Sequence, residues 1–285
     1  MLIDINNNEF KLFQEYLLKN SGINIPIEKK YLFRTRLSEL INAKNLNSFG
    51  ELYQQFKNTD NQELQNKIIE VMTTNETSFF RDGHPFETFQ NIILPEIIKQ
   101  KSKEALHYSP KIRIWSAACS TGQEPYSVAM ILMEMLKMES RCGIEDVYIL
   151  STDISSSVLN RARKGLYTDD EVKKGMKDKY KGRYITRHNE SLWEITDDIK
   201  KMVDFKELNL SKDFSDNLFH FDIIFCRNLI IYFLDELKRK VIEQFHRLLN
   251  PKGILIIGAA ENLYGISDDF EVSHNGKTTI YRTKK

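Results

Sequence analysis

The second half of the chain is constrained most by a regular alternation of short apolar runs with longer amphipathic stretches. The runs typical of buried strands are IRIWSA (112–117), VYILST (147–152), VDFKELNL (203–210), FDIIFC (221–226) and GILIIGA (253–259). Residues 123–136, 155–165 and 236–249 have helical patterns instead. Strands that alternate with helices predict a mostly parallel sheet covered by helices on both faces.

Two segments depart from this alternation. TTIYRT (278–283) can pair with residues 270–274 through an Asn275-Gly276 turn, which predicts a C-terminal hairpin at the sheet edge and seven strands in all. Between 166 and 200 the sequence is charged and of short period, and we expect a small inserted β-subdomain there.

The N-terminal part has only helical patterns. Phe10, Phe13, Leu17 and Leu18 recur at helical spacing over 7–20, and Gly22 is expected to end that helix. A second helix should begin after Pro26 and turn Leu32, Leu37, Leu40 and Ile41 inward, and shorter helices are expected at about 47–58 and 62–73.

These patterns divide the chain into three parts. We expect an all-α domain over 1–73 and a linker with a further helix, near 84–101, over 74–111. An α/β domain that contains the insertion 166–200 should then occupy 112–285. Residues 101–111 form a polar stretch before the first strand.

Composition restricts the class of protein. Lysine plus arginine (41) nearly balance aspartate plus glutamate (40), which argues against a dedicated nucleic-acid-binding protein. Cys119, Cys142 and Cys226 form no CxxC pair and the six histidines no HExxH motif, so neither a disulfide framework nor a metal site is expected. No apolar run approaches the ~20 residues that span a bilayer. The N-terminus also lacks the apolar core of a signal peptide, and we expect a cytoplasmic protein that is not inserted in a membrane.

The turn after the first strand is a candidate ligand site. In a doubly wound sheet, ligands bind beyond the carboxyl ends of the strands, where the first strand leads into the first helix. Here that turn is Ala117–Gly122, whose small side chains allow close approach to the backbone. It is not GxGxxG, so a dinucleotide is not indicated, and the turn alone is equally typical of a tight connection without a ligand.

Asp153 ends the second strand. A carboxylate at that place can accept hydrogen bonds from both hydroxyls of a ribose. The alternative is that Asp153 caps the helix that begins near Ser155. The turn and Asp153 together favour an adenosine-containing ligand.

Four segments carry a family resemblance. In chain order they are TTNETSFFRD (73–82), WSAACSTGQEPYS (115–127), TDIS (152–155) and FCRNLIIYF (225–233). They resemble, in the same order, the motifs of the chemotaxis-receptor methyltransferases of the CheR family. The resemblance implies a Rossmann-like domain dependent on S-adenosylmethionine, with a helical N-terminal domain and an inserted β-subdomain. It also implies transfer of a methyl group to receptor glutamates, giving methyl esters and S-adenosylhomocysteine, for sensory adaptation in chemotaxis.

The resemblance also implies which residues lie at the cofactor. Arg81 would bind the methionyl carboxylate, since its planar fork suits a bidentate contact, but a surface ion pair is the alternative. Glu124 would accept from the amino group, unless it only complements the helix dipole. Asn209 and Leu210 would lie beside the adenine. The full set of implied cofactor residues is Asn75, Thr77, Arg81, Ala117, Glu124, Asp153, Asn209, Leu210, Arg227 and Asn228.

Tyr232 matches a tyrosine placed near the transferring methyl, although a tyrosine in LIIYF is more often a core residue. A glutamate carboxylate is already ionised at neutral pH and needs no general base. The reaction therefore depends on alignment and on removal of water, and we expect no catalytic dyad. Tyr232 and Arg81 are the candidates for shaping the methyl-transfer site.

The expected partner is the cytoplasmic helical domain of a chemotaxis receptor. The second helix carries Lys29, Lys30, Arg34 and Arg36, which suit a glutamate-rich partner, or which form an ordinary solvated face.

Some family members also bind a receptor's C-terminal pentapeptide on the inserted β-subdomain, and these have a glycine-containing loop between two of its strands. Here the matching stretch runs from Arg183-Tyr184-Ile185 to Trp193-Glu194-Ile195, and the connection 186–192 contains no glycine. We therefore expect independence from such a tether. The alternative is that the length of this loop merely varies within the family and that the sheet edge still accepts a strand.

Two other functions are less well supported. Amino-methylating nucleic-acid enzymes commonly have an (N/D)PP(Y/F) motif after the fourth strand, where this chain has CRNLIIYF. A module that only senses the cofactor or scaffolds the receptor array would not need competent residues at every cofactor position, as this chain has.

Overall fold

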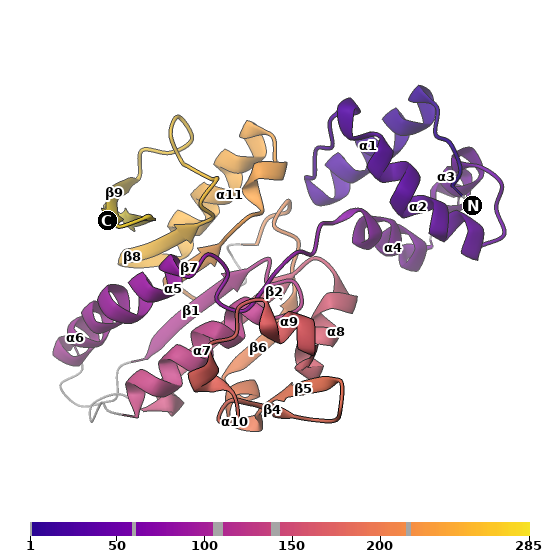
Figure 1. Ribbon diagram of the computed structural model, residues 1–285. Helices are drawn as coiled ribbons and strands as arrows, with labels where there is room; N and C mark the ends of the chain where they lie inside the picture. The colour runs from indigo at the N-terminus through magenta and orange to yellow at the C-terminus, as the bar shows by residue number, and fades with distance from the viewer. Residues whose placement is uncertain (1, 59–60, 105–110, 138–142, 215–217) are drawn as a thin grey trace.

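The computed structural model describes residues 2–58, 61–104, 111–137, 143–214 and 218–285. A helical N-terminal domain and an α/β domain lie side by side, joined by an extended linker (Figure 1). Cys142 and most of the expected polar stretch before the first strand lie outside the described residues. Cys119 and Cys226 are free and buried. In the described parts of the chain, no helix is both long and apolar enough to cross a membrane.

The N-terminal domain is built from α1 (Asn7–Ser21), α2 (Tyr31–Ala43), α3 (Phe49–Asn58) and α4 (Gln62–Met72). Helix α1 starts with a capping box between Asn6 and Glu9, and it ends at Gly22, whose φ of 75° is the left-handed cap expected of glycine. Phe13 is fully buried and its ring contacts those of four aromatic neighbours, Phe33, Phe49, Tyr53 and Phe56.

The second helix differs in detail from the expectation. A short 3-10 turn, η1 (Ile27–Lys29), follows Pro26, and α2 begins only at Tyr31. Leu37 and Ile41 are buried as predicted, but Leu32 and Leu40 are only half-buried. Phe33 fills the core instead, because the helix is rotated slightly from the phase that its leucines suggest.

A nearly continuous helical run follows the linker. It consists of α5 (His84–Thr88), the π-helical turn η2 (Phe89–Ile93) and α6 (Leu94–Glu104). The prediction of a helix near 84–101 is confirmed.

The main sheet has the order β6-β2-β1-β7-β8-β10-β9. Its strands, from that edge, are β6 (Val203–Glu207), β2 (Val147–Asp153), β1 (Ile112–Ala117), β7 (Phe221–Cys226), β8 (Leu249–Ile257), β10 (Thr278–Thr283) and β9 (Phe270–Asn275). The first five are parallel, and β10 and β9 are antiparallel. The predicted seven-stranded sheet with its hairpin is confirmed. The strand order reverses at β1 and β7, the place where such sheets bind ligands.

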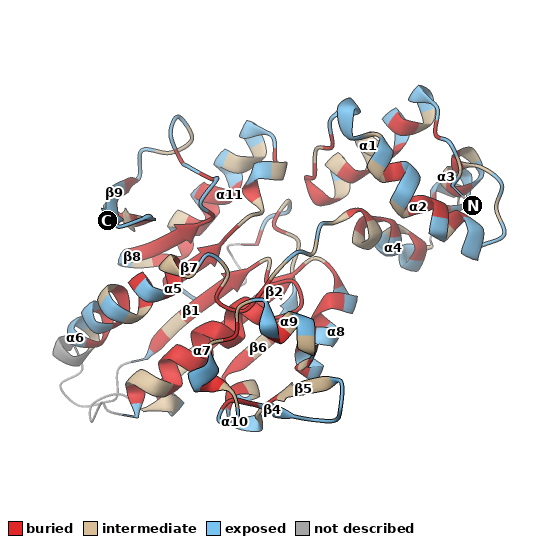
Figure 2. Cartoon of the chain, in the orientation of Figure 1, coloured by how far each residue is buried: buried red, intermediate tan, exposed pale blue. Residues whose placement is uncertain are grey.

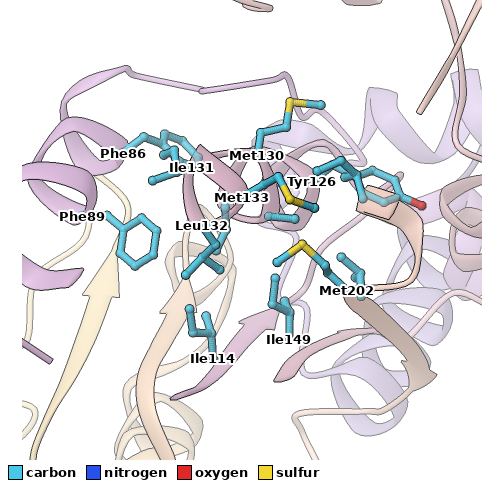
Figure 3. Packing of buried hydrophobic residues seen from close by; sticks show 14 of the residues in the cluster. Phe86, Phe89, Ile114, Tyr126, Met130, Ile131, Leu132, Met133, Ile149 and Met202 are labelled. Atoms are coloured by element: carbon cyan, nitrogen blue, oxygen red, sulfur yellow. The ribbon is translucent and has the colours of Figure 1, made fainter. Parts of the chain in front are cut away.

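Alternate strand residues contact opposite layers of helices. Ile114 belongs to the core under α7 (Gln123–Leu136) and α6, whereas Trp115 packs toward α11 (Asp235–Leu248). Figure 3 shows the first of these cores, with side chains of α7 over Ile114 and Ile149. The central strands and α7 are almost wholly buried, whereas the edge strand β9 is mostly exposed and the outer helices are exposed on one side (Figure 2).

The inserted subdomain follows α8 (Ser156–Lys164) and has a second sheet of order β3-β5-β4. Its elements are β3 (Leu166–Thr168), α9 (Asp169–Lys173), η4 (Asp178–Tyr180), β4 (Ile185–Arg187), β5 (Leu192–Ile195) and α10 (Asp197–Lys200). It packs on the linker through ring contacts of Phe79 with Tyr167 (4.9 Å) and of Phe80 with Tyr180 (5.1 Å).

Several element boundaries differ from the predictions. The Tyr184 N–H bonds to the Tyr180 carbonyl in a turn, so β4 begins at Ile185 and not at Arg183. Asn275 pairs with Thr278, which leaves the hairpin turn at residues 276–277. Strand β6 ends at residue 207, three residues before the predicted end at 210. Strand β8 begins at residue 249 and not at 253, so residues 250–251 belong to the strand and not to a loop.

Candidate functional site

A pocket lies at the carboxyl ends of β1, β2 and β7. Its wall comes from the linker, the turn after β1, the ends of β2 and β6, the segment after β7, and Ser21 and Ile23 of the N-terminal domain. The structure brings together ten predicted residues in this wall: Asn75, Thr77, Arg81, Glu124, Asp153, Asn209, Leu210, Arg227, Asn228 and Tyr232. Ala117 is the exception, because its side chain is fully buried in the core beside Leu150, and Ala118, Cys119 and Ser120 line the pocket instead.

The turn after β1 has an unusual backbone. Ala118 (φ 60°), Ser120 (φ 51°) and Gly122 (φ 90°) all have left-handed conformations, which cost energy for residues with a Cβ. The Ser120 N–H donates to Asp153 Oδ2 (2.9 Å), and the Ser120 hydroxyl donates to the carbonyl of Asn75 (3.0 Å). The turn is therefore held by the end of β2 on one side and by the linker on the other.

Asp153 is buried at the end of β2. Its Oδ1 accepts from the Ser155 N–H (3.1 Å), but the cap of α8 is the Ser155 hydroxyl, which accepts from the Val158 N–H (3.4 Å). Burial raises the pKa of Asp153, while backbone N–H groups that bond to it act in the opposite direction. Each carboxylate oxygen has a second lone pair, so Asp153 can also accept from a ligand's hydroxyls.

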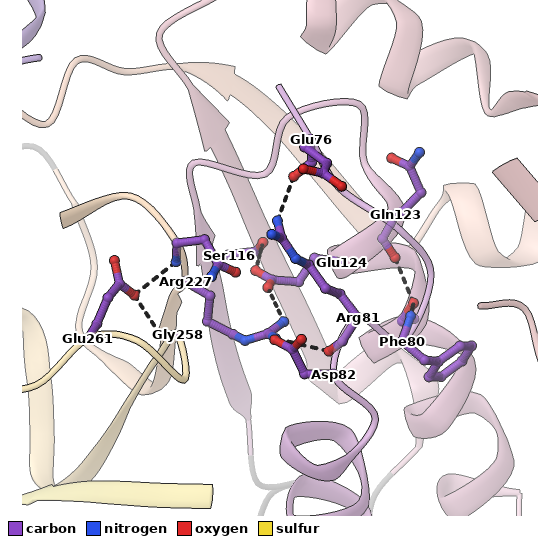
Figure 4. Close-up of polar contacts among 12 residues, drawn as sticks. Glu76, Phe80, Arg81, Asp82, Ser116, Gln123, Glu124, Arg227, Gly258 and Glu261 are labelled. Atoms are coloured by element: carbon purple, nitrogen blue, oxygen red, sulfur yellow. Dashed lines mark hydrogen bonds and ion pairs between the residues drawn. The ribbon is translucent and has the colours of Figure 1, made fainter. Parts of the chain in front are cut away.

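Arg227 joins three parts of the site, and its side chain is only 2% exposed. Its guanidinium bonds to Glu124 Oε2 (3.0 Å) and to Asp82 Oδ2 (2.6 Å), as Figure 4 shows. Glu124 Oε1 accepts from the Ser116 hydroxyl (2.8 Å). Asp82 was missed at the sequence level, although it ends the TTNETSFFRD segment. The arrangement connects the end of the linker to the start of α7 through the segment after β7.

Arg81 lines the pocket and is partly exposed. Its Nη1 donates to the Glu76 carbonyl (2.6 Å), which leaves further N–H groups for a ligand. Among the described residues no carboxylate lies within ion-pair distance of Arg81, although the hydrogen bond from Lys174 and, to a smaller extent, the charge of Arg81 lower the pKa of Glu76. A cation at this place suits the carboxylate of a bound ligand.

The N-terminal domain completes the rim beside Asn209. The Asn209 amide donates to the carbonyl of Asn20 at the end of α1 (2.6 Å), and its oxygen accepts from the Ser211 N–H (2.9 Å). Asn209 therefore connects the two domains, and the second N–H of its amide remains available on the pocket side. Leu210 is buried beside it. The contribution of the N-terminal domain to this wall was not predicted, since no local pattern signals it.

Tyr232 ends the 3-10 turn η6 (Ile230–Tyr232) and lines the pocket. Its ring is partly buried against the apolar clusters of both domains, and its carbonyl accepts from the Asn24 N–H (2.9 Å). The side chain thus has packing contacts and a face on the pocket.

The basic residues near the second helix differ in their surroundings. Arg36 donates to the carbonyls of Met72 (2.8 Å) and Thr73 (3.2 Å), so it secures the start of the linker. Lys30 donates to Asn7 (2.9 Å), while Lys29 and Arg34 are exposed.

Comparison with known proteins places these observations in context. Residues 75–279 match the family model described as the SAM binding domain of CheR methyltransferases, and residues 8–73 match its all-alpha domain. The chain is 37% identical over 278 residues to chemotaxis protein methyltransferase 1 of Pseudomonas aeruginosa, with 98% of each chain covered. It is 37% identical over 283 residues to the corresponding protein of Vibrio cholerae, with 99% of each covered. The chemotaxis protein methyltransferase of Borreliella burgdorferi is 36% identical over 265 residues, which cover 92% of this chain and 91% of that protein.

Proposed function

Because the chain belongs to the CheR methyltransferase family, we propose that this chemotaxis methyltransferase esterifies glutamate side chains of a chemotaxis receptor with the methyl group of S-adenosylmethionine. The observation that carries the proposal is the pocket itself. It combines a buried carboxylate, Asp153, with a partly exposed cation, Arg81, at the carboxyl ends of the central strands.

The residues of the pocket fit the cofactor's chemical groups. Asp153 can accept from the ribose hydroxyls, and Arg81 can bind the methionyl carboxylate in a bidentate manner. Glu124 can accept from the amino group through its remaining lone pairs, although Arg227 and Ser116 already bond to it. Asn75 and Thr77 on the linker, and Asn228 after β7, line the same space.

The protein's task at the reacting atoms is alignment. Bound S-adenosylmethionine supplies a methyl group on a sulfonium, which is already activated for transfer to an ionised carboxylate. The chain must then hold the carboxylate in line with the methyl group and exclude water from it. Tyr232 lies between the apolar clusters of the two domains and lines the pocket, so it can shape this site together with Arg81.

The test uses S-adenosylmethionine labelled in its methyl group together with membranes that contain a chemotaxis receptor. We expect label on the receptor, released as volatile methanol in alkali, because a methyl ester is labile to base. Receptors whose methylatable glutamates are replaced by alanine serve as the control. Label that resists alkali would indicate N-methylation and would contradict the proposal.

Tyr232→Phe should lower kcat more than it lowers cofactor affinity, since we place the hydroxyl near the methyl group rather than near the adenosine. Steady-state kinetics and titration calorimetry with S-adenosylhomocysteine give the two quantities. Tyr264→Phe is the control, because Tyr264 is 94% exposed and should change neither. Equal losses of turnover and affinity in Tyr232→Phe would mark Tyr232 as a packing residue of the pocket.

We also propose that the enzyme does not require a receptor pentapeptide tether. The β4–β5 connection is closed by its own hydrogen bonds, from the His188 N–H to the Leu192 carbonyl (3.0 Å) and from the Leu192 N–H to Asn189 Oδ1 (2.9 Å). Without glycine, this tight connection has few ways to open for a docking strand.

A tether-type pentapeptide should therefore show no micromolar binding in a calorimetric titration. Receptors with and without the C-terminal tail should be methylated at similar rates. Micromolar binding, or a strong loss of methylation when the tail is removed, would contradict this prediction.

A further inference from the structure

Glu261 is a buried carboxylate that has no role in the site described so far. It lies in the turn after β8, is 8% exposed, and does not line the pocket. Its Oε2 accepts from the N–H groups of Gly258 (2.6 Å) and Asn228 (2.8 Å), and its Oε1 accepts from the Ile231 N–H (3.3 Å). In Figure 4 the carboxylate points toward the chain that follows Arg227.

These bonds converge on the segment that carries Arg227, Asn228 and Tyr232. Asn228 has a φ of 60°, a left-handed conformation that asparagine tolerates better than other residues with a Cβ but that is still uncommon. The Leu229 N–H also acts to lower the pKa of Glu261, so the N–H groups of Asn228, Leu229 and Ile231 all favour the charged form of one carboxylate. Successive N–H groups of this kind form a concave anion site, and here the anion is a side chain of the same protein.

Gly258 allows the two segments to approach. A Cβ added at this position would lie 2.7 Å from Glu261 Oε2 and 2.8 Å from the Asn228 nitrogen. Both distances are shorter than the contacts that Cβ atoms make in proteins, so a larger residue would push the two segments apart. Burial raises the pKa of Glu261, while the backbone N–H bonds oppose that change. An ionised carboxylate offers about four lone-pair sites, which are enough to accept from all of these N–H groups.

We propose that Glu261 is a positioning residue for methyl transfer, which fixes the 228–231 backbone and thereby the orientation of Tyr232. The inference rests on the role proposed above for Tyr232. Glu261 acts through the backbone, because its carboxylate accepts from backbone N–H groups and does not line the pocket. A displacement of about 1 Å at a methyl-transfer site can cost about 100-fold in rate.

Glu261→Gln tests the proposal in the full-length enzyme. Glutamine keeps the size of the side chain but turns an NH₂ group toward backbone donors. We expect kcat to fall by about 10- to 100-fold, while affinity for S-adenosylhomocysteine changes by less than about threefold. Amide hydrogen exchange at residues 228, 229 and 231 should become faster, which measures the contact without any activity.

Asp222→Asn is the matched control. Asp222 is also a buried carboxylate and accepts from the Arg113 N–H (2.9 Å), but it lies near the amino end of β7, away from the pocket. This variant should be less stable, with unchanged kcat and unchanged exchange at 228–231.

Three results would overturn the proposal: unchanged exchange in Glu261→Gln, an equal fall of kcat in both variants, or a cofactor affinity that falls in step with kcat. A parent enzyme that formed no receptor ester would instead reject the proposed function, and amide exchange would still decide whether Glu261 holds the segment.

Discussion

Arg227→Met is expected to lower the free energy of unfolding by about 3 kcal/mol. Removal of one partner from a buried ion pair leaves an uncompensated charge and typically costs about 3–5 kcal/mol. Here Glu124 keeps its burial, with a side chain 11% exposed, whereas the Asp82 side chain is 35% exposed and can be rehydrated. We therefore expect the lower end of that range.

The same substitution should also weaken cofactor binding. Arg227 is the link between the end of the linker and the start of α7, and both segments line the pocket. Without it, the linker that carries Arg81 loses a fixed point. Chemical denaturation measures the first effect, and titration with S-adenosylhomocysteine measures the second.

Arg282→Met provides the control for Arg227→Met. Arg282 pairs with Glu96 at 2.8 Å, but the two side chains are 28% and 54% exposed. Exposed pairs contribute about 0–1 kcal/mol, so this variant should lose little stability and no cofactor affinity. Equal destabilisation of the two variants would show that burial of the ion pairs of Arg227 with Asp82 and Glu124 does not increase their contribution to stability.

Asp153→Ala should reduce cofactor affinity at least tenfold while the fold is retained. Each hydrogen bond to a charged acceptor is worth about 1.5–3 kcal/mol, and the substitution removes the acceptor proposed for both ribose hydroxyls. It also removes the acceptor for the Ser120 N–H, so the left-handed turn after β1 loses its support at the same time.

Asp146→Ala separates this effect from general loss of a buried carboxylate. Asp146 lies directly before the amino end of β2, whereas Asp153 lies at the carboxyl end. Asp146 is 5% exposed and accepts from the Gly143 N–H (3.0 Å). Calorimetry should show unchanged affinity for this variant, and circular dichroism should show that both variants are folded. Unchanged affinity in Asp153→Ala would contradict the ribose assignment.

The fold could be predicted because its signals are local. Apolar runs bounded by turns mark strands, and helical spacing marks the elements between them, whatever their partners are. The boundaries at residues 185, 207, 249 and 276 were less accurate, because a strand continues only where a neighbouring strand supplies hydrogen-bond partners. Those partners come from distant parts of the chain.

The location of the pocket also followed from the sequence. The carboxyl ends of adjacent parallel strands meet at one edge of the sheet, so the turn after β1 and Asp153 had to lie close together. The family motifs added the linker and the segment after β7, and the structure places these residues in the same wall.

The sequence by itself therefore determined the layers, the strand types and the edge of the sheet where a ligand can bind, since these depend on short-range periodicity. Tertiary structure alone decided the partner of each polar side chain. Asn209 bonds to Asn20, 189 residues away, and Arg227 bonds to Asp82 and Glu124. Glu261, which no motif distinguishes, bonds to the backbone of Asn228. A buried polar group must bond to whatever donor or acceptor the packed chain brings within reach, and that is set by the packing of whole domains.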